Sequence, residues 1–123
     1  MPRASNSTPA SLLKVRVRIA RGGDFAFGPG KAQVLESLIE TGSLNRTASA
    51  MRMSYVKALD LVHTMNTHFA EPLVVLSRGG RHGGGAQITE AGRKVLAEYL
   101  AMCAASEAAA QPGWRKLRKL LKG

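Results

Sequence analysis

The chain has 123 residues, 45% of them hydrophobic, and carries 18 Lys and Arg against 8 Asp and Glu, a formal net charge of +10. This length allows one compact domain with short appendages. The basic excess favours a polyanionic partner, either nucleic acid or an anionic membrane surface. The single cysteine, Cys103, excludes an internal disulfide framework, and no apolar run approaches the roughly 18 to 20 residues of a membrane span. We therefore expect a cytoplasmic protein.

The N-terminal part of the chain predicts an arm followed by a hairpin. Residues 1–12 are rich in Ser, Pro, Asn and Ala, which is typical of a disordered arm and unlike a secretory signal. Residues 14–20 alternate apolar and basic side chains, the period of a half-buried strand. Gly22-Gly23 predicts a turn. Phe25 and Phe27 then either form a short partner strand or cover the core from a loop.

A helix is predicted over residues 31–41. Its apolar side chains recur at the helical spacing of three and four and form one face, made of Val34, Leu35, Leu38 and Ile39. Gly42 follows, and glycine commonly ends a helix in the left-handed conformation.

Two more helices are predicted at 43–51 and 54–69, with Ser43 and Ser54 as their N-caps. The side chains expected to face the core are Leu44, Ala48 and Met51 in the first helix and Ala58, Leu61, Val62, Met65 and Phe69 in the second. Such a helix-turn-helix places its second helix in the major groove of DNA. The alternative is a small helical core whose outer face is merely solvated.

The candidate DNA-reading residues lie at the start of the 54–69 helix and in the helix before it. Polar groups in a first turn reach base edges or flanking phosphates, whereas an apolar group reads contacts such as the thymine methyl. Asp60 on the same face would repel phosphate, so we do not expect it at the DNA backbone. The expected set is Arg46, Ser54, Tyr55, Val56 and Lys57.

A two-stranded wing is predicted after the helices. Residues 73–76 have the composition of a buried strand, and residues 86–88 form a short returning strand. Five of the eight loop residues 78–85 are glycine, which permits close approach of the backbone to a ligand. We expect this loop to contact the DNA backbone or minor groove through Arg78, Arg81, His82 and Gly83. A hairpin tip without function and a small-anion site are the alternatives.

The C-terminal third predicts one long helix and a basic tail. Thr89 is a suitable cap for a helix to about residue 110, where Gln111-Pro112-Gly113 is expected to stop it. The inner face is expected to contain Val95, Leu96, Tyr99, Leu100 and Cys103. Residues 111–123 form a basic amphipathic tail with three alternative roles. It could add positive charge for DNA binding, lie on a membrane surface as a helix, or dock on its own domain or dimer mate. Docking or disorder is favoured over membrane binding.

No pattern in the chain points to catalysis. His63, His68 and His82 lack metal-ligand spacing with one another or with Cys103. No carboxylate pair or activated nucleophile is evident. We expect neither an enzyme nor a metal site.

An ordered series of short motifs resembles the DNA-binding domain of ModE-type molybdate-responsive regulators over about residues 14–104. The motifs are Phe27-Gly28-Pro29-Gly30-Lys31, Leu35-Glu36, Glu40-Thr41-Gly42-Ser43, Met53-Ser54-Tyr55, Met65-Asn66, Glu71-Pro72-Leu73-Val74, Gly79-Gly80-Arg81, Gly83-Gly84-Gly85-Ala86, Ile88-Thr89 and Gly92. The run from Thr89 to Gly92 is also similar to the helix start of LysR-type regulators.

The resemblance implies a mainly α fold with a small β wing. It implies a winged helix-turn-helix domain over residues 13–110, whose long helix, about 89–110, pairs two subunits into a homodimer. The residues expected at the dimer interface are Leu96, Tyr99, Leu100 and Cys103. By the same resemblance Ser54 to Lys57 begin the recognition helix and Arg81 lies in the wing. Glycine is common in the family's turn where this chain has Arg52.

Full-length regulators of this type also carry a C-terminal molybdate-binding region. The chain ends at Gly123, which leaves no room for such a region, so we expect no molybdate or tungstate cofactor. The sequence thus predicts a homodimeric, sequence-specific, duplex-DNA-binding transcriptional regulator of ModE-like type. The alternatives are a non-DNA module that binds a protein or a membrane, and a small-oxyanion sensor.

Overall fold

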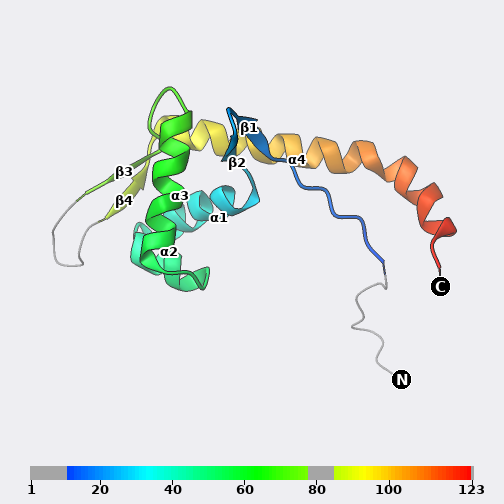
Figure 1. The fold of residues 1–123 in the computed structure, drawn as a ribbon, viewed down its shortest axis with the longest axis horizontal. Helices are drawn as coiled ribbons and strands as arrows, with labels where there is room; N and C mark the ends of the chain where they lie inside the picture. Colours follow the sequence, from blue (N-terminus) through cyan, green and yellow to red (C-terminus); the bar gives the residue numbers. More distant parts are fainter. Residues whose placement is uncertain (1–10, 78–84, 123) are drawn as a thin grey trace, which may run out of the picture.

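The computed structural model describes residues 11–77 and 85–122 and confirms a winged helix-turn-helix with a long C-terminal helix (Figure 1). The elements in chain order are β1 (Ile19–Arg21), β2 (Asp24–Phe27), α1 (Pro29–Thr41), α2 (Leu44–Ala50), α3 (Tyr55–His68), β3 (Val74–Leu76), β4 (Ala86–Ile88), α4 (Glu90–Leu117) and the short 3-10 helix η2 (Arg118–Leu120). The strands form two separate antiparallel pairs, β1–β2 and β3–β4. The four α-helices make the protein mainly helical, as predicted.

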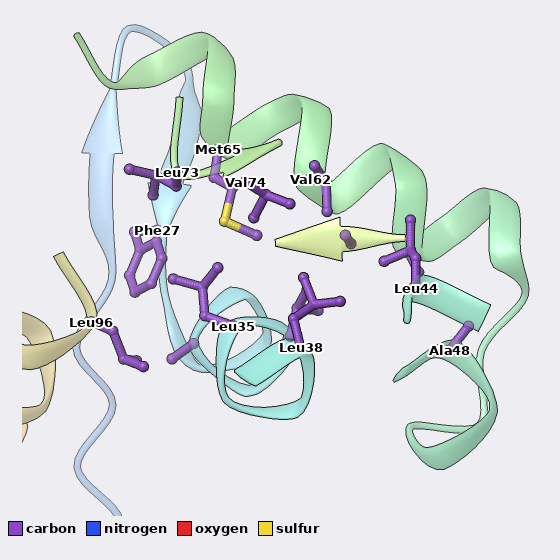
Figure 2. Packing of buried hydrophobic residues seen from close by; sticks show 14 of the residues in the cluster. Phe27, Leu35, Leu38, Leu44, Ala48, Val62, Met65, Leu73, Val74 and Leu96 are labelled. Atoms are coloured by element: carbon purple, nitrogen blue, oxygen red, sulfur yellow. The ribbon is translucent and has the colours of Figure 1, made fainter. Parts of the chain in front are cut away.

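One hydrophobic core joins the β1–β2 hairpin to α1, α3, β3 and the first half of α4 (Figure 2). Phe27 of β2 is fully buried, with its ring edge-on to Phe69 at 6.0 Å and to Tyr99 of α4 at 5.0 Å between centroids. Leu35 of α1 and Met65 of α3 are fully buried in the same core. The start of α4 is therefore part of the domain's own packing.

The helix ends follow the predicted capping residues. Gly42 ends α1 in the left-handed conformation, with φ 66°. The Ser43 hydroxyl accepts the N–H of Arg46 at 3.1 Å, and the Ser54 hydroxyl accepts the N–H of Lys57 at 3.0 Å. These caps satisfy backbone donors that a helix start leaves without partners.

The first helix differs from the prediction at two points. It begins at Pro29, two residues early, because proline fits a first helical position and the Gly28 carbonyl accepts the N–H of Ala32. The sequence pattern places Ile39 on the buried face, but 44% of its surface is exposed. Val34, Leu35 and Leu38 are buried while Ile39 is not, so the buried face of α1 is narrower than expected.

The predicted strand over residues 14–20 is mostly unpaired. Only Ile19–Arg21 pairs, because β2 has four residues before Gly28 and Pro29 begin α1. The alternation of exposure nevertheless continues from residue 13 to residue 20. This extended segment lies along α4, where the Tyr99 hydroxyl donates to the Val17 carbonyl at 2.7 Å.

Asn66 anchors the wing to α3. Its Oδ1 accepts the N–H groups of Leu73 at 2.8 Å and Val74 at 3.3 Å, and its Nδ2 donates to the Val74 carbonyl at 3.0 Å. Leu73 and Val74 are buried, but Val75 and Leu76 are 52% and 36% exposed, so the prediction of a buried strand fails for its second half. Each face of a two-stranded ribbon is covered only where a helix lies against it.

The long helix α4 begins on the cap predicted at Thr89, whose hydroxyl accepts the N–H of Gly92 at 2.9 Å. The prediction of a helix end near residue 110 is wrong. α4 continues through Pro112 to Leu117, and Figure 1 shows its last turns bending. Proline lacks the N–H of the helical ladder and clashes with a carbonyl one turn earlier, which favours a bend.

Candidate nucleic-acid interface

The helix-turn-helix is fixed to the rest of the domain by a polar contact and a tight turn. Thr47 of α2 is fully buried, and its hydroxyl donates to the Ser37 hydroxyl of α1 at 3.0 Å. The N–H of Met53 donates to the Ala48 carbonyl at 3.0 Å, which closes the turn between α2 and α3. This arrangement holds the start of α3 at a set orientation.

The first turn of α3 presents its side chains to solvent. Tyr55 is 43% exposed and Val56 is 72% exposed, and Lys57 is exposed beside them. The Ser54 hydroxyl is occupied by its capping bond, so Ser54 positions the helix as well as offering a hydroxyl. An exposed phenol, an apolar group and an ammonium together can contact base edges, a thymine methyl and a phosphate.

Two arginines are exposed before α3, one on α2 and one in the turn between α2 and α3. Arg46, a predicted site residue, is exposed on α2. Arg52 is not among the predicted site residues, yet it is exposed in the turn between the helices at φ 55°, a left-handed conformation that side chains other than glycine rarely adopt. A basic residue in the turn between the two helices is the sequence feature by which Arg52 could have been included among the predicted DNA-contacting residues.

The described part of the wing includes its base, where Ser77 and Gly85 pair. The Ser77 N–H donates to the Gly85 carbonyl at 2.8 Å and the Gly85 N–H donates back at 3.1 Å. The predicted wing contacts Arg78, Arg81, His82 and Gly83 lie outside the described residues. In Figure 1 the strands β3 and β4 lie on one side of α3 and the β1–β2 hairpin on the other.

The four residues predicted at a dimer interface differ in exposure. Leu96 and Tyr99 are 6% and 3% exposed because they pack into the core of their own subunit, whereas Leu100 is 42% exposed. Cys103 is half-buried beside them. Of the four residues, Leu100 is therefore the exposed one.

Tyr99 has a perturbed ionisation. Burial of its hydroxyl, with a smaller contribution from the neighbouring Cys103 thiol, raises the pKa of Tyr99 from 10.0 to about 12. Its hydrogen bond to the Val17 carbonyl also requires the protonated phenol. The group is thus a structural donor at neutral pH.

Residues 11–77 and 85–122 contain no group of three His, Cys, Asp or Glu side chains that could hold a metal ion. Within the same ranges no helix combines the length and the apolar character needed to cross a membrane.

Comparison with known proteins gives three informative relatives. The chain is 43% identical over 77 residues to the "Molybdenum transport protein ModE" of Azotobacter vinelandii, a match that covers 63% of this chain and 28% of the relative. It is 36% identical over 87 residues to the "Molybdenum-pterin-binding protein MopA" of Rhodobacter capsulatus, covering 71% of this chain and 33% of the relative. It is 31% identical over 71 residues to the "DNA-binding transcriptional dual regulator ModE" of Escherichia coli, covering 58% and 27%.

No family model matches the chain. The matched region spans a third or less of the length of these relatives. The relatives agree with the motif series read from the sequence, whereas the more distant likeness to LysR-type regulators stays a prediction. About three fifths of this chain is therefore similar in sequence to ModE and the molybdenum-pterin-binding proteins, which agrees with the resemblance to a ModE-type domain.

Proposed function

We propose that this protein is a sequence-specific, duplex-DNA-binding transcriptional regulator of the ModE type that acts as a homodimer. The observation that carries the proposal is the exposed first turn of α3, which a helix-turn-helix holds out beside a wing. The net charge of +10 suits a polyanionic partner. Relatives named as transcriptional regulators support the same role.

Within this proposal the residues have separate tasks. Tyr55 and Val56 read bases, because both are exposed and offer a hydroxyl and an apolar group to base edges. Lys57 and Arg46 contact phosphates and set the register. Arg78, Arg81, His82 and Gly83 supply the wing contact. Leu100 and the later turns of α4 bind a second subunit.

The experiment is selection of bound duplexes from a random pool, followed by affinity measurements on the selected and a scrambled duplex. We expect Tyr55→Ala to reduce the preference for the selected duplex, because a base contact carries sequence information. We expect Lys57→Gln to weaken binding to both duplexes by the same factor. A wild-type protein that binds neither duplex would overturn the proposal.

A second candidate is binding of a molybdenum compound, which the names of the Azotobacter and Rhodobacter relatives favour. Thermal unfolding of the full chain with molybdate, tungstate and sulfate tests it. A rise in Tm with the first two anions and none with sulfate supports this role. Equal curves for all three anions argue against it.

A further inference from the structure

A basic groove lies on the flank of α3 that faces away from the wing. It has a volume of about 210 Å³ and is lined by Arg16, Arg18, Phe25, Gly28, Lys31 and Leu61. These residues come from the extended N-terminal segment, β2, the start of α1 and the middle of α3. We call this the basic groove.

The charges of the basic groove are not neutralised by the described part of the chain. Its lining includes three basic side chains and no acid. Within residues 11–77 and 85–122 the one ion pair joins His68 to Asp24, so Arg16, Arg18 and Lys31 have no carboxylate partner there. Glu36 lies in the neighbouring groove that Arg16 also lines.

The Arg18 side chain is held in place by packing. Its guanidinium lies over the Phe25 ring, 5.3 Å from the centroid. Its stem passes the buried Gly28, where a Cβ would lie 3.5 Å from the Arg18 Cγ. Ordering a long cation before it meets a ligand reduces the entropy lost on binding.

The basic groove continues the charged surface of the reading end of α3. Lys57 lies four residues before Leu61, so the two share one face of the helix, about 6 Å apart along its axis. Lys57 is therefore one helical turn from the groove residue Leu61. The exposed Asp60 lies between them in the sequence, so a bound phosphate strand would have to pass Lys57 and Lys31 without approaching Asp60.

We propose that the basic groove binds the DNA phosphate strand on the side of the recognition helix opposite the wing; this inference rests on the proposed function. A helix in a major groove about 12 Å wide has a phosphate strand on either side. In Figure 1, β3 and β4 lie on one side of α3 and the β1–β2 hairpin, which borders the basic groove, lies on the other. The two surfaces thus bracket α3.

The test compares two double variants of the full chain that remove the same charge. Arg18→Gln/Lys31→Gln changes the basic groove, and Arg93→Gln/Lys94→Gln removes an arginine and a lysine from exposed positions at the start of α4. Affinities for the selected and the scrambled duplex are measured by fluorescence anisotropy across a salt series. Thermal unfolding of both variants checks that they are folded.

We expect the groove variant to weaken binding to both duplexes by one common factor. Its log–log salt slope should flatten by about 0.9 for each phosphate that a bound subunit no longer neutralises. The control should keep a slope within about 0.5 of the wild type, because its charges lie away from the proposed phosphate path.

Three other outcomes show whether the groove assignment, the proposed function or the kind of ligand is wrong. If the groove variant matches the control while Lys57→Gln still weakens binding, the groove assignment is wrong and the proposed function stands. If the wild type binds no duplex, the proposed function and this inference fall together. If inorganic phosphate raises the Tm of the wild type but not of the groove variant, with equal DNA affinities, the groove binds a free anion instead.

Discussion

At the scale of single residues, Gly92 is where a side chain is least tolerated. A Cβ there would overlap the Leu73 carbonyl oxygen and lie 2.9 Å from the Ile88 Cγ2. Both neighbours belong to the junction between the wing and α4, which Thr89 closes by donating to the Pro72 carbonyl at 2.7 Å. Backbone atoms cannot move aside as a flexible side chain can, so the junction itself would have to shift.

Gly92→Ala should therefore lower the free energy of unfolding by about 1 to 3 kcal/mol, measured by urea denaturation. Gly113 is the matched control, because it lies in the same helix and a Cβ there would meet no heavy atom within 4 Å. Gly113→Ala should raise the stability by about 0.5 to 1 kcal/mol. Equal effects of the two substitutions would contradict the packing described for Gly92.

Tyr99 gives a prediction about pH. Its pKa of about 12 in the folded protein lies above the unfolded value of 10.0. An acid whose pKa is raised by folding stabilises the protein fully below the unfolded pKa, and the contribution is lost as pH rises through the folded pKa. The free energy of unfolding of the wild type, relative to Tyr99→Phe, should thus shrink between pH 10 and 12. A constant difference over that range would count against the buried phenol.

At the scale of elements, features that depend on neighbouring residues are predictable and those that depend on distant ones are not. Ser43, Ser54 and Thr89 are recognisable as caps because capping is a bond to a residue three positions on. The apolar pattern at 14–20 overestimates the length of the strand, because the number of paired residues in β1 depends on the length of β2. The basic groove could not be read from the sequence, since it brings together residues of separate elements.

At the end of α4 the presence of a proline did not predict where the helix ends, because the neighbouring residues also determine the outcome. Pro112 is expected to stop the helix, yet helical residues continue to Leu117. Ala108 to Ala110 lie before the proline and Arg115 to Leu117 after it, and these residues favour helix, whereas Gly113 directly after the proline does not. A helix can pass through proline at the cost of one hydrogen bond and a bend.

Pro112→Ala should consequently strengthen the last turns of α4. Amide exchange of residues 113–117 should slow by at least about tenfold, because proline costs about 3 kcal/mol in a helix interior. Gln111→Ala leaves the proline in place and should change these rates little. Unchanged exchange in Pro112→Ala would show that the proline does not limit the helix there.

At the scale of the whole molecule, charge and shape divide the protein into two parts. Five of its 18 basic residues lie among the last nine residues, at the end of the helix that leads away from the core (Figure 1). The other 13 basic residues belong to the part of the chain before residue 115, which includes the compact domain and the exposed start of α3. We expect the compact domain to bind DNA and the exposed part of α4 to bind the second subunit.

The fold class and the order of the helices and strands could be predicted, while several element bounds and part of the interface could not. The exposed first turn of α3 is identifiable from Ser54 onward, because the cap fixes where the helix starts. The resemblance assigns Leu96 and Tyr99 to pairing. The apolar spacing shows only that their helix face is buried, and in the structure that burial is within the subunit. Leu100 remains available for that role.

Salt-dependent binding of the full chain to its selected duplex tests the central claim most directly. If a dimer makes about four phosphate contacts per subunit, the plot of log affinity against log salt should have a slope of about −7. The selected duplex should also bind more tightly than a scrambled one at every salt concentration. A nearly flat plot with equal affinity for both duplexes would contradict the assignment of this protein as a DNA-reading regulator.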